Sequence, residues 1–201
     1  MPARLAYALL TLTLCTIAAV AGVWIAARGH DSGVAVGATG WAGFSRPPGA
    51  TAPAFRLRDQ DGRPATMAQY RGRPLVVTFV YSTCRDTCPA QVQTIRGALD
   101  DLGHDVPVYG VSVDPANDTR RSAQAFLLEQ KMKGRMEFLV GDRAHLAPMW
   151  KAFGIAPQRN GREHSSYTVL VDASGHQRIG FPVDKLTQRG LAHDLARLAR
   201  G

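Results

Sequence analysis

Cys84 and Cys88 are the residues of this sequence whose types and spacing are best suited to chemistry. Pro89 follows them, and proline is favoured in the first turn of a helix, so Cys88 is expected at a helix N-terminus. There the helix dipole and free backbone N–H groups favour thiolate over thiol, which promotes metal ligation and thiol–disulfide exchange alike. Two soft thiolates about one turn apart suit Cu(I).

Other interpretations of the cysteine pair are weaker. Inert buried thiols or a static disulfide are not expected where a strand end meets a helix N-terminus. A closed zinc site needs four protein ligands, and the sequence has no second cysteine pair outside the apolar N-terminal run, which holds only Cys15. Dithiol exchange enzymes commonly use Cys-x-x-Cys, and the spacing here is one residue wider. Copper ligation and dithiol exchange therefore both stay open.

The elements that must position these cysteines alternate along the chain. Residues 74–81 form a continuous β-rich apolar run, which predicts a buried central strand leading directly to Cys84. Apolar residues then recur at helical spacing as far as Gly103, a good helix stop. The pattern continues with strands at 106–113, 136–140, 166–171 and 177–181, with helices at 118–133 and around 146–153, and with a last helix through Leu198.

This alternation predicts an α/β fold with a central mixed sheet and helices on both faces. Short apolar pieces around residues 55–57 and 65–67 flank an Asp-Gly turn, which adds a hairpin at the N-terminal side of the domain. In such sheets functional groups gather at the carboxyl ends of the strands, where Cys84 is expected.

The N-terminal region predicts a membrane anchor. Residues 5–27 carry no charged side chain, and a run of that length spans a hydrocarbon core of about 30 Å. We interpret residues 1–28 as an uncleaved anchor, the Gly- and Pro-containing residues 29–52 as a flexible linker, and residues 53–201 as the folded domain.

The composition is that of a globular protein, with 45% hydrophobic and 20% charged residues. The net charge of +8 is dispersed along the chain. Because no Lys/Arg cluster is interleaved with stacking aromatic residues, we do not expect nucleic-acid binding.

Three separate motifs resemble the Sco (SenC) family of copper chaperones for cytochrome c oxidase assembly. They are TFVYSTCRDTCP at residues 78–89, VSVDP at 111–115 followed by Asp118-Thr119, and His164-Ser165. The resemblance extends from about residue 52 to the C-terminus. It implies a thioredoxin-like fold with an added N-terminal hairpin, a single N-terminal anchor, and a copper ion bound by Cys84, Cys88 and His164.

His164 is the histidine with a reason to meet the cysteines. It directly precedes the predicted strand 166–171, and the resemblance implies that the loop entering this strand lies against the cysteine motif. An imidazole nitrogen would complete a trigonal S₂N site for Cu(I), and a weak fourth ligand would allow Cu(II). On family grounds Asp114 is a candidate to orient the imidazole, and an equally good interpretation is an Asp-Pro turn. Met149 is interpreted as core packing.

Two classes of function follow. The first is a metallochaperone, not an enzyme, that delivers copper to the CuA site in the copper-site subunit of cytochrome c oxidase. The alternative is a thiol–disulfide oxidoreductase in which Cys84 attacks a partner disulfide and Cys88 resolves the mixed disulfide. A peroxiredoxin-like peroxidase is a third, weaker interpretation. The two leading functions both place the domain on the extracytoplasmic (periplasmic) side of the inner membrane, where thiols can cycle with disulfides.

Overall fold

The computed structural model describes residues 12–20, 34–156 and 167–200. The chain divides into two units, Met1–Val34 and Ala35–Gly201. In the first unit, residues 12–20 are helical. None of the helices in the three described ranges combines the length and the apolar character needed to cross a membrane. Most of the predicted anchor, residues 1–28, lies outside these ranges, so the anchor stays a prediction.

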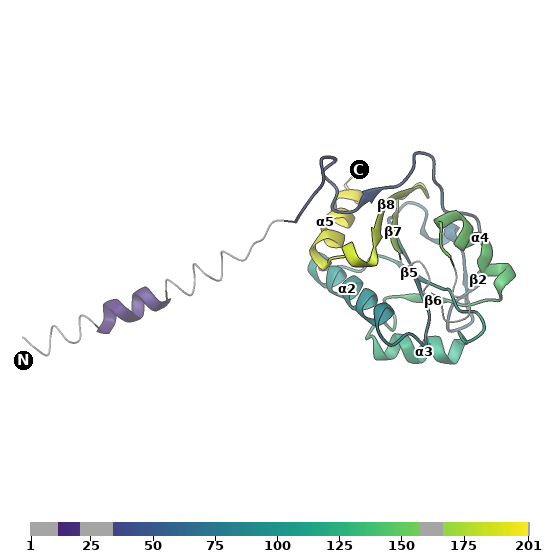
Figure 1. Ribbon diagram of the computed structural model, residues 1–201, viewed down its shortest axis with the longest axis horizontal. Helices are drawn as coiled ribbons and strands as arrows, with labels where there is room; N and C mark the ends of the chain where they lie inside the picture. The colour runs from purple at the N-terminus through teal and green to yellow at the C-terminus, as the bar shows by residue number, and fades with distance from the viewer. Residues whose placement is uncertain (1–11, 21–33, 157–166, 201) are drawn as a thin grey trace, which may run out of the picture. The chain divides into compact units, whose positions relative to one another are not determined.

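The second unit alternates strands and helices as the sequence predicts (Figure 1). Its elements are β1 (Phe44–Ser45), β2 (Leu57–Arg58), β3 (Pro64–Ala65), η1 (Met67–Tyr70), β4 (Leu75–Val80), α2 (Thr87–Leu102), β5 (Val108–Ser112), α3 (Arg120–Glu129), β6 (Glu137–Leu139), α4 (Arg143–Phe153), β7 (Tyr167–Val171), β8 (Gln177–Pro182), η2 (Val183–Lys185) and α5 (Gln188–Leu198).

The predicted mixed sheet is confirmed. Its strand order is β1-β8-β7-β4-β5-β6. Strand β4 pairs in parallel with β5, which pairs in parallel with β6, whereas β7 is antiparallel to β4 and β8 is antiparallel to β7. Every residue of β4 is buried, as expected for a central strand covered on both faces. Because β4 and β7 run in opposite directions, β7 begins at the end of the sheet where β4 finishes, which is the end that carries the cysteine loop.

Two apolar cores fill the space on either side of the sheet. One joins Val92 and Ile95 of α2 to side chains of α3 and α5. The other joins Leu146 and Phe153 of α4 to the N-terminal hairpin. Helices α2 and α5 accordingly lie on one side of the sheet and α4 on the other (Figure 1). Met149 is fully buried in the second core, which confirms its packing role.

The predicted hairpin is also confirmed. Strands β2 and β3 form a separate antiparallel pair in which Leu57 faces Ala65. Their turn contains Gly62 with φ +83°, a conformation that L-residues rarely adopt. An isolated bridge between Arg58 and Val140 fastens the hairpin beside the end of β6.

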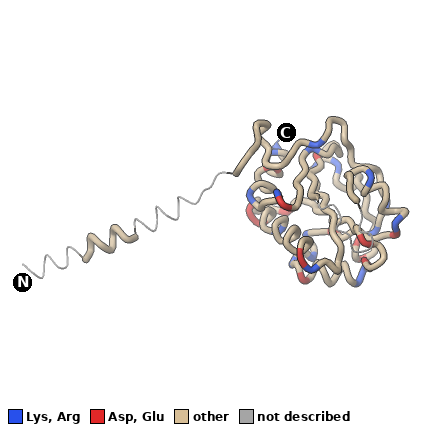
Figure 2. The backbone as a smooth tube through the Cα atoms, viewed as in Figure 1, with Lys and Arg blue, Asp and Glu red and all other residues tan. Residues whose placement is uncertain are grey.

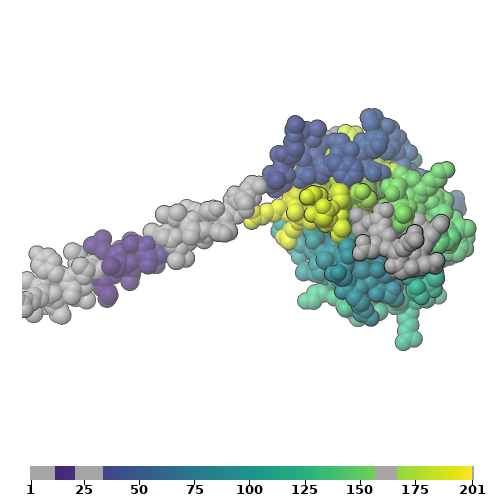
Figure 3. Space-filling model, viewed as in Figure 1, coloured from purple at the N-terminus to yellow at the C-terminus, as the bar shows by residue number. Residues whose placement is uncertain are grey.

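The prediction of a flexible linker over residues 29–52 is wrong for its described part from Ala35 onward, which belongs to the compact unit. Strand β1 pairs with β8 at the edge of the sheet. Asp194 is buried, and its carboxylate accepts two backbone hydrogen bonds from this segment. The Ala42 N–H donates to Oδ1 and the Gly43 N–H donates to Oδ2, both at 2.9 Å. Figure 3 shows this dark blue segment lying against the yellow C-terminal helix. The folded domain therefore begins before residue 53.

Close packing explains why this segment resembles a linker in sequence. A Cβ on Gly43 would lie 2.5 Å from Ile179 Cγ2 and 2.7 Å from the Gly180 carbonyl oxygen. The small residue is thus required by the approach of β1 to β8, whereas composition alone suggests flexibility. Farther along, the Arg46 guanidinium donates to Gln177 Oε1 at 2.9 Å.

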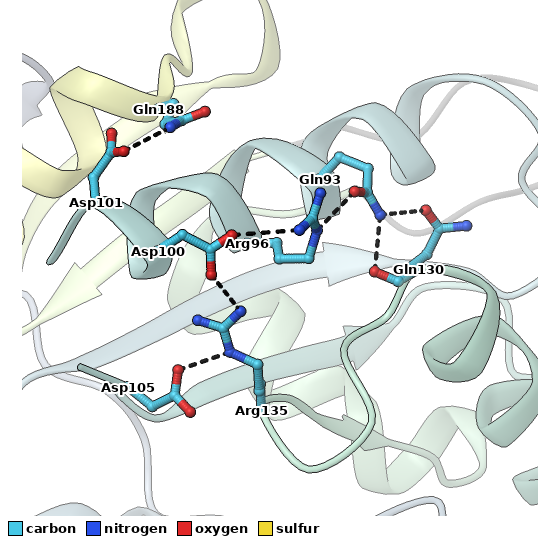
Figure 4. A network of polar contacts seen from close by, with 8 residues as sticks. All are labelled: Gln93, Arg96, Asp100, Asp101, Asp105, Gln130, Arg135 and Gln188. Carbon is cyan, nitrogen blue, oxygen red and sulfur yellow. Dashed lines mark hydrogen bonds and ion pairs between the residues drawn. The ribbon is translucent and has the colours of Figure 1, made fainter. Parts of the chain in front are cut away.

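A polar network holds α2, the helix that begins at the cysteines, against its neighbours (Figure 4). Arg135 donates to Asp100 and to Asp105, both at 2.7 Å. At the other end of the network, Gln93 donates to the Gln130 carbonyl at 2.8 Å. Exposed ion pairs of this kind each contribute about 0.2–1 kcal/mol, so the network orients α2 more than it stabilises the fold.

Candidate metal and thiol site

The two cysteines lie where the sequence predicts, at the junction of β4 and α2. Cys88 is the second residue of α2 and Pro89 the third, so Pro89 is in the first helical turn as expected. The Cys88 N–H donates to Cys84 Sγ at 3.2 Å. Cys84 is 7% exposed and Cys88 is fully buried. One sulfur therefore lies close to the surface and the other beneath it.

The surroundings give the two thiols different acidities. Burial opposes ionisation of Cys84, but hydrogen bonds from the Cys88 thiol, from the Asp86 and Cys88 N–H groups and from the Tyr81 hydroxyl outweigh it and lower the pKa of Cys84. Burial, followed by the hydrogen bond with Cys84, raises the pKa of Cys88. The pair thus combines a thiolate-forming sulfur near the surface with a deeper sulfur that holds its proton.

A buried carboxylate fixes the loop that leads to Cys84. Asp118 Oδ1 accepts hydrogen bonds from the Ser82 N–H at 2.7 Å and from the Ser82 hydroxyl at 2.6 Å. Its Oδ2 accepts from the Ser112 hydroxyl, at the end of β5, at 2.5 Å. Asp118 is 7% exposed. Because Ser82 is two residues before Cys84, this carboxylate ties the cysteine loop to the sheet.

A buried amide ties α2 to the start of β7. Gln91, one turn after Cys88, donates through Nε2 to the Thr78 and Thr168 hydroxyls at 2.5 and 3.1 Å. Thr78 and Thr168 are directly paired across β4 and β7. The Gln91 Oε1 atom is buried and has no hydrogen-bond partner within the described ranges. The cysteine helix is therefore coupled to the strand that follows the predicted histidine ligand.

The third predicted ligand, His164, lies outside the described residues. Within the described part of the chain, no group of three His, Cys, Asp or Glu side chains could hold a metal ion. The structure thus brings Cys84 and Cys88 together, and the part of His164 stays a prediction. Strand β7 begins three residues after His164, at the sheet edge where β4 leads into the cysteine loop.

Asp114 has the turn role. Its Oδ2 accepts from Asn117 Nδ2 at 2.8 Å, and its carbonyl accepts from the Asp118 N–H at 2.9 Å. These contacts fit the Asp-Pro turn, and the orienting of the His164 imidazole by Asp114 stays a prediction because His164 lies outside the described residues. Sequence reasoning gave Asp118, which holds the cysteine loop, no role of its own. Gln91 was also missed, although a lone amide between apolar helix positions such as Val92 and Ile95 is a usable signal for a buried polar contact.

The fold and the paired thiols define the class of the protein, a thioredoxin-like α/β protein with a Cys-x-x-x-Cys site at the carboxyl end of its central strand. A family model described as SCO1/SenC matches residues 45–200. The chain belongs to the SCO1/SenC family.

Solved structures and curated proteins agree with this assignment. The structure of Bradyrhizobium japonicum ScoI with copper bound is 29% identical, covers 74% of this chain and 99% of its own, and has a TM-score of 0.63. BsSco, described as a member of the Sco family of cytochrome c oxidase assembly proteins with a disulfide switch, is 21% identical, covers 76% and 95%, and has a TM-score of 0.67. A SCO2-like protein of Rickettsia prowazekii is 24% identical over 65% of this chain and 68% of its own length.

Peroxiredoxin Q of Sedum lineare is similar as well, with 30% identity over 63% of this chain and 64% of the relative. The family match covers a larger part of the chain, from residue 45 to residue 200. The peroxidase interpretation accordingly remains the weaker one.

Proposed function

We propose that this protein binds one copper ion through Cys84, Cys88 and His164 and delivers it to the CuA site of cytochrome c oxidase during assembly. The copper is cargo, which the protein acquires and gives up. Residues 5–27 would anchor the domain in the inner membrane, with the domain on the extracytoplasmic side. Copper bound to a family member, Bradyrhizobium japonicum ScoI, supports the choice of metal.

The observation that carries the proposal is the arrangement of the two thiols at the start of α2. Thiolate ligands are soft donors that suit Cu(I), and they must lose their protons to bind it. The Cys88 N–H bond to Cys84 Sγ at 3.2 Å holds Cys84, in the loop before α2, against the first turn of the helix. Strand β7 begins at the end of the sheet where β4 leads into the cysteine loop, and the proposed third ligand, His164, precedes Tyr167, the first residue of β7, by three positions in the sequence.

The opposite acidities of the thiols favour a second candidate, thiol–disulfide exchange. The Cys84 thiolate would attack a partner disulfide, forming a mixed disulfide and releasing one partner thiolate. Cys88, after giving up its proton, would attack Cys84 Sγ, forming the Cys84–Cys88 disulfide and releasing the second partner thiolate. The partner gains two electrons and this protein loses two.

Complementation separates the two functions. A strain that lacks this gene would receive the wild type, His164→Ala or the control His104→Ala, which removes an exposed histidine bonded to the Leu102 carbonyl. Copper delivery requires that His164→Ala fail to restore oxidase activity at ordinary copper levels while His104→Ala restores it. Restoration by His164→Ala would instead favour dithiol exchange, which needs no imidazole.

A further inference from the structure

A second site lies at the same edge of the sheet as the cysteines. A cavity of about 740 Å³ opens between the hairpin, the loop after β5 and the start of α4. Its lining includes the apolar side chains of Leu57, Pro115 and Val140. The elements around it, β2, β6, α3 and α4, lie together in Figure 1. It is distinct from the Cys84–Cys88 pair, which does not line it.

Three arginines line this cavity: Arg56, Arg58 and Arg120. Arg56 immediately precedes β2 and Arg58 is its last residue. Both are exposed and alternate with the buried Leu57, so they lie on the same face of the extended segment. Arg120, also exposed, is the first residue of α3. We refer to these three residues as the arginine cluster.

Two of the guanidinium groups converge on the hairpin turn. Arg58 Nη1 donates to the Gly62 carbonyl at 2.8 Å. Arg120 Nη1 lies 2.7 Å from the point where a Cβ on Gly62 would be. Like charges brought to one turn repel each other, and an anion between them would relieve that repulsion.

Within the described ranges, no carboxylate forms an ion pair with any member of the arginine cluster. The acidic residues of the lining are otherwise engaged. Asp118 accepts from Ser82 and Ser112, and Asp142 accepts from the backbone and ring of His145. The cluster therefore offers guanidinium groups that pair with no carboxylate of the described residues, and the three arginines against two aspartates leave the lining a formal charge of +1. Elsewhere on this unit, basic and acidic residues are interspersed (Figure 2).

From this juxtaposition we propose that the arginine cluster and its cavity form the docking surface for an acidic, partly apolar segment of the protein that exchanges copper or electrons with the cysteines. Carboxylates of that segment would bind the guanidinium groups, and an apolar side chain would enter between Leu57 and Val140. Asp118 lines the cavity and bonds Ser82, so a partner docked there lies beside the cysteine loop. The proposal deepens the proposed function and rests on it for the partner's identity.

The test uses the full chain in detergent micelles and a fluorescein-labelled peptide of repeating Glu-Asp-Leu as the probe, read by fluorescence anisotropy. Two double variants are compared, Arg58→Gln with Arg120→Gln, and Arg63→Gln with Arg121→Gln. The second is a matched control because Arg63 and Arg121 come from the same hairpin and helix but line a different cavity. Glutamine at position 58 can still donate to the Gly62 carbonyl, and circular dichroism checks that each variant is folded.

We expect saturable binding by the wild type that weakens about tenfold or more when the Arg58 and Arg120 charges are removed, because two charge-assisted contacts with the carboxylates of the peptide are lost together. The control should bind as the wild type does, and added salt should weaken wild-type binding. If the double variant is unfolded, each single variant should weaken binding by a smaller factor. No saturable binding by the wild type, equal affinity in the two double variants, or equal binding of a Gln-Asn-Leu peptide overturns the proposal.

Copper affinity measured on the same samples keeps the two proposals apart. Wild type that takes up copper but does not bind the acidic peptide overturns the docking surface alone. Peptide binding without copper uptake supports the docking surface and overturns copper delivery. Removing the two charges should leave copper affinity unchanged, because neither arginine lies among the proposed ligands.

Discussion

Replacing Asp118 should weaken the fold and loosen the cysteine loop, and the choice of replacement should matter. Asp118→Ala removes the acceptor of three hydrogen bonds, two from Ser82 and one from Ser112. The carboxylate is 7% exposed, so water replaces little of what is lost. A bond to a charged group contributes about 1.5–3 kcal/mol, and the carboxylate's own burial offsets part of the sum. We expect Asp118→Ala to lower the free energy of unfolding by about 2–4 kcal/mol.

Asp118→Asn should be much milder, at about 1 kcal/mol, because the amide oxygen can accept from the Ser82 N–H while the amide nitrogen donates to Ser112 Oγ. Burial raises the pKa of Asp118, and the nearby Asp114 charge raises it further, while the serine hydrogen bonds act in the opposite direction. The folded protein therefore holds this proton more tightly than the unfolded chain does. The part of the Asp118 contribution that depends on its proton is fully present below the ordinary pKa of 3.8 and is lost as the pH rises through the raised value, whereas the hydrogen bonds accepted from the two serines remain.

The free energy of unfolding is measured by urea unfolding at several values between about pH 3 and pH 7. Three versions of residues 35–201 are compared: the wild type, Asp118→Asn and Asp118→Ala. The stability of wild type relative to Asp118→Asn should fall as the pH rises, with other carboxylates cancelling in the difference. The alkylation rate of Cys84 should change in Asp118→Ala and return toward the wild-type rate in Asp118→Asn. A stability difference that grows with pH, or equal losses in the two variants, would refute the reasoning.

Three further predictions test the fold and the anchor. Gly110→Ala places a Cβ against Met136 Cε, closer than van der Waals contact allows, and should destabilise the domain by about 1–3 kcal/mol in urea unfolding. The same substitution should cost less in a Met136→Ala background than in the wild type, and equal costs in the two backgrounds would show that the two side chains do not clash. Asp194→Ala removes the acceptor of the Ala42 N–H, so hydrogen exchange at that amide should accelerate, and an unchanged rate would contradict its anchoring role. The full chain should sediment with membranes while residues 35–201 stay in the soluble fraction, and recovery of the full chain as a soluble protein of full mass would contradict an uncleaved anchor.

Much of the fold could be predicted because its signals are long and periodic. The buried run of β4 and the helical spacing that ends at Gly103 are examples, and the structure has both. Strand β1 has two residues, too few for any period to show. Its place depends on the N–H groups that meet Asp194, a contact between positions about 150 residues apart that a local pattern does not encode.

The candidate site divides in the same way. Cys84 and Cys88 were predictable because strand, cysteines and Pro89 are contiguous in sequence. The support of the cysteine loop by Asp118 was not, because two aspartates follow β5 and only their three-dimensional placement decides which one faces Ser82. The motif that includes His164 was recognised by resemblance, and its geometry lies outside the described residues.

X-ray absorption at the copper edge of the loaded protein tests the central claim most directly. The full chain would be reduced, loaded anaerobically with one equivalent of Cu(I), and compared with His164→Ala and with the control His104→Ala. The account predicts two sulfur ligands and one nitrogen ligand in the wild type and the control, and loss of the nitrogen ligand in His164→Ala. A copper site without sulfur, or a spectrum that His164→Ala leaves unchanged, would contradict it.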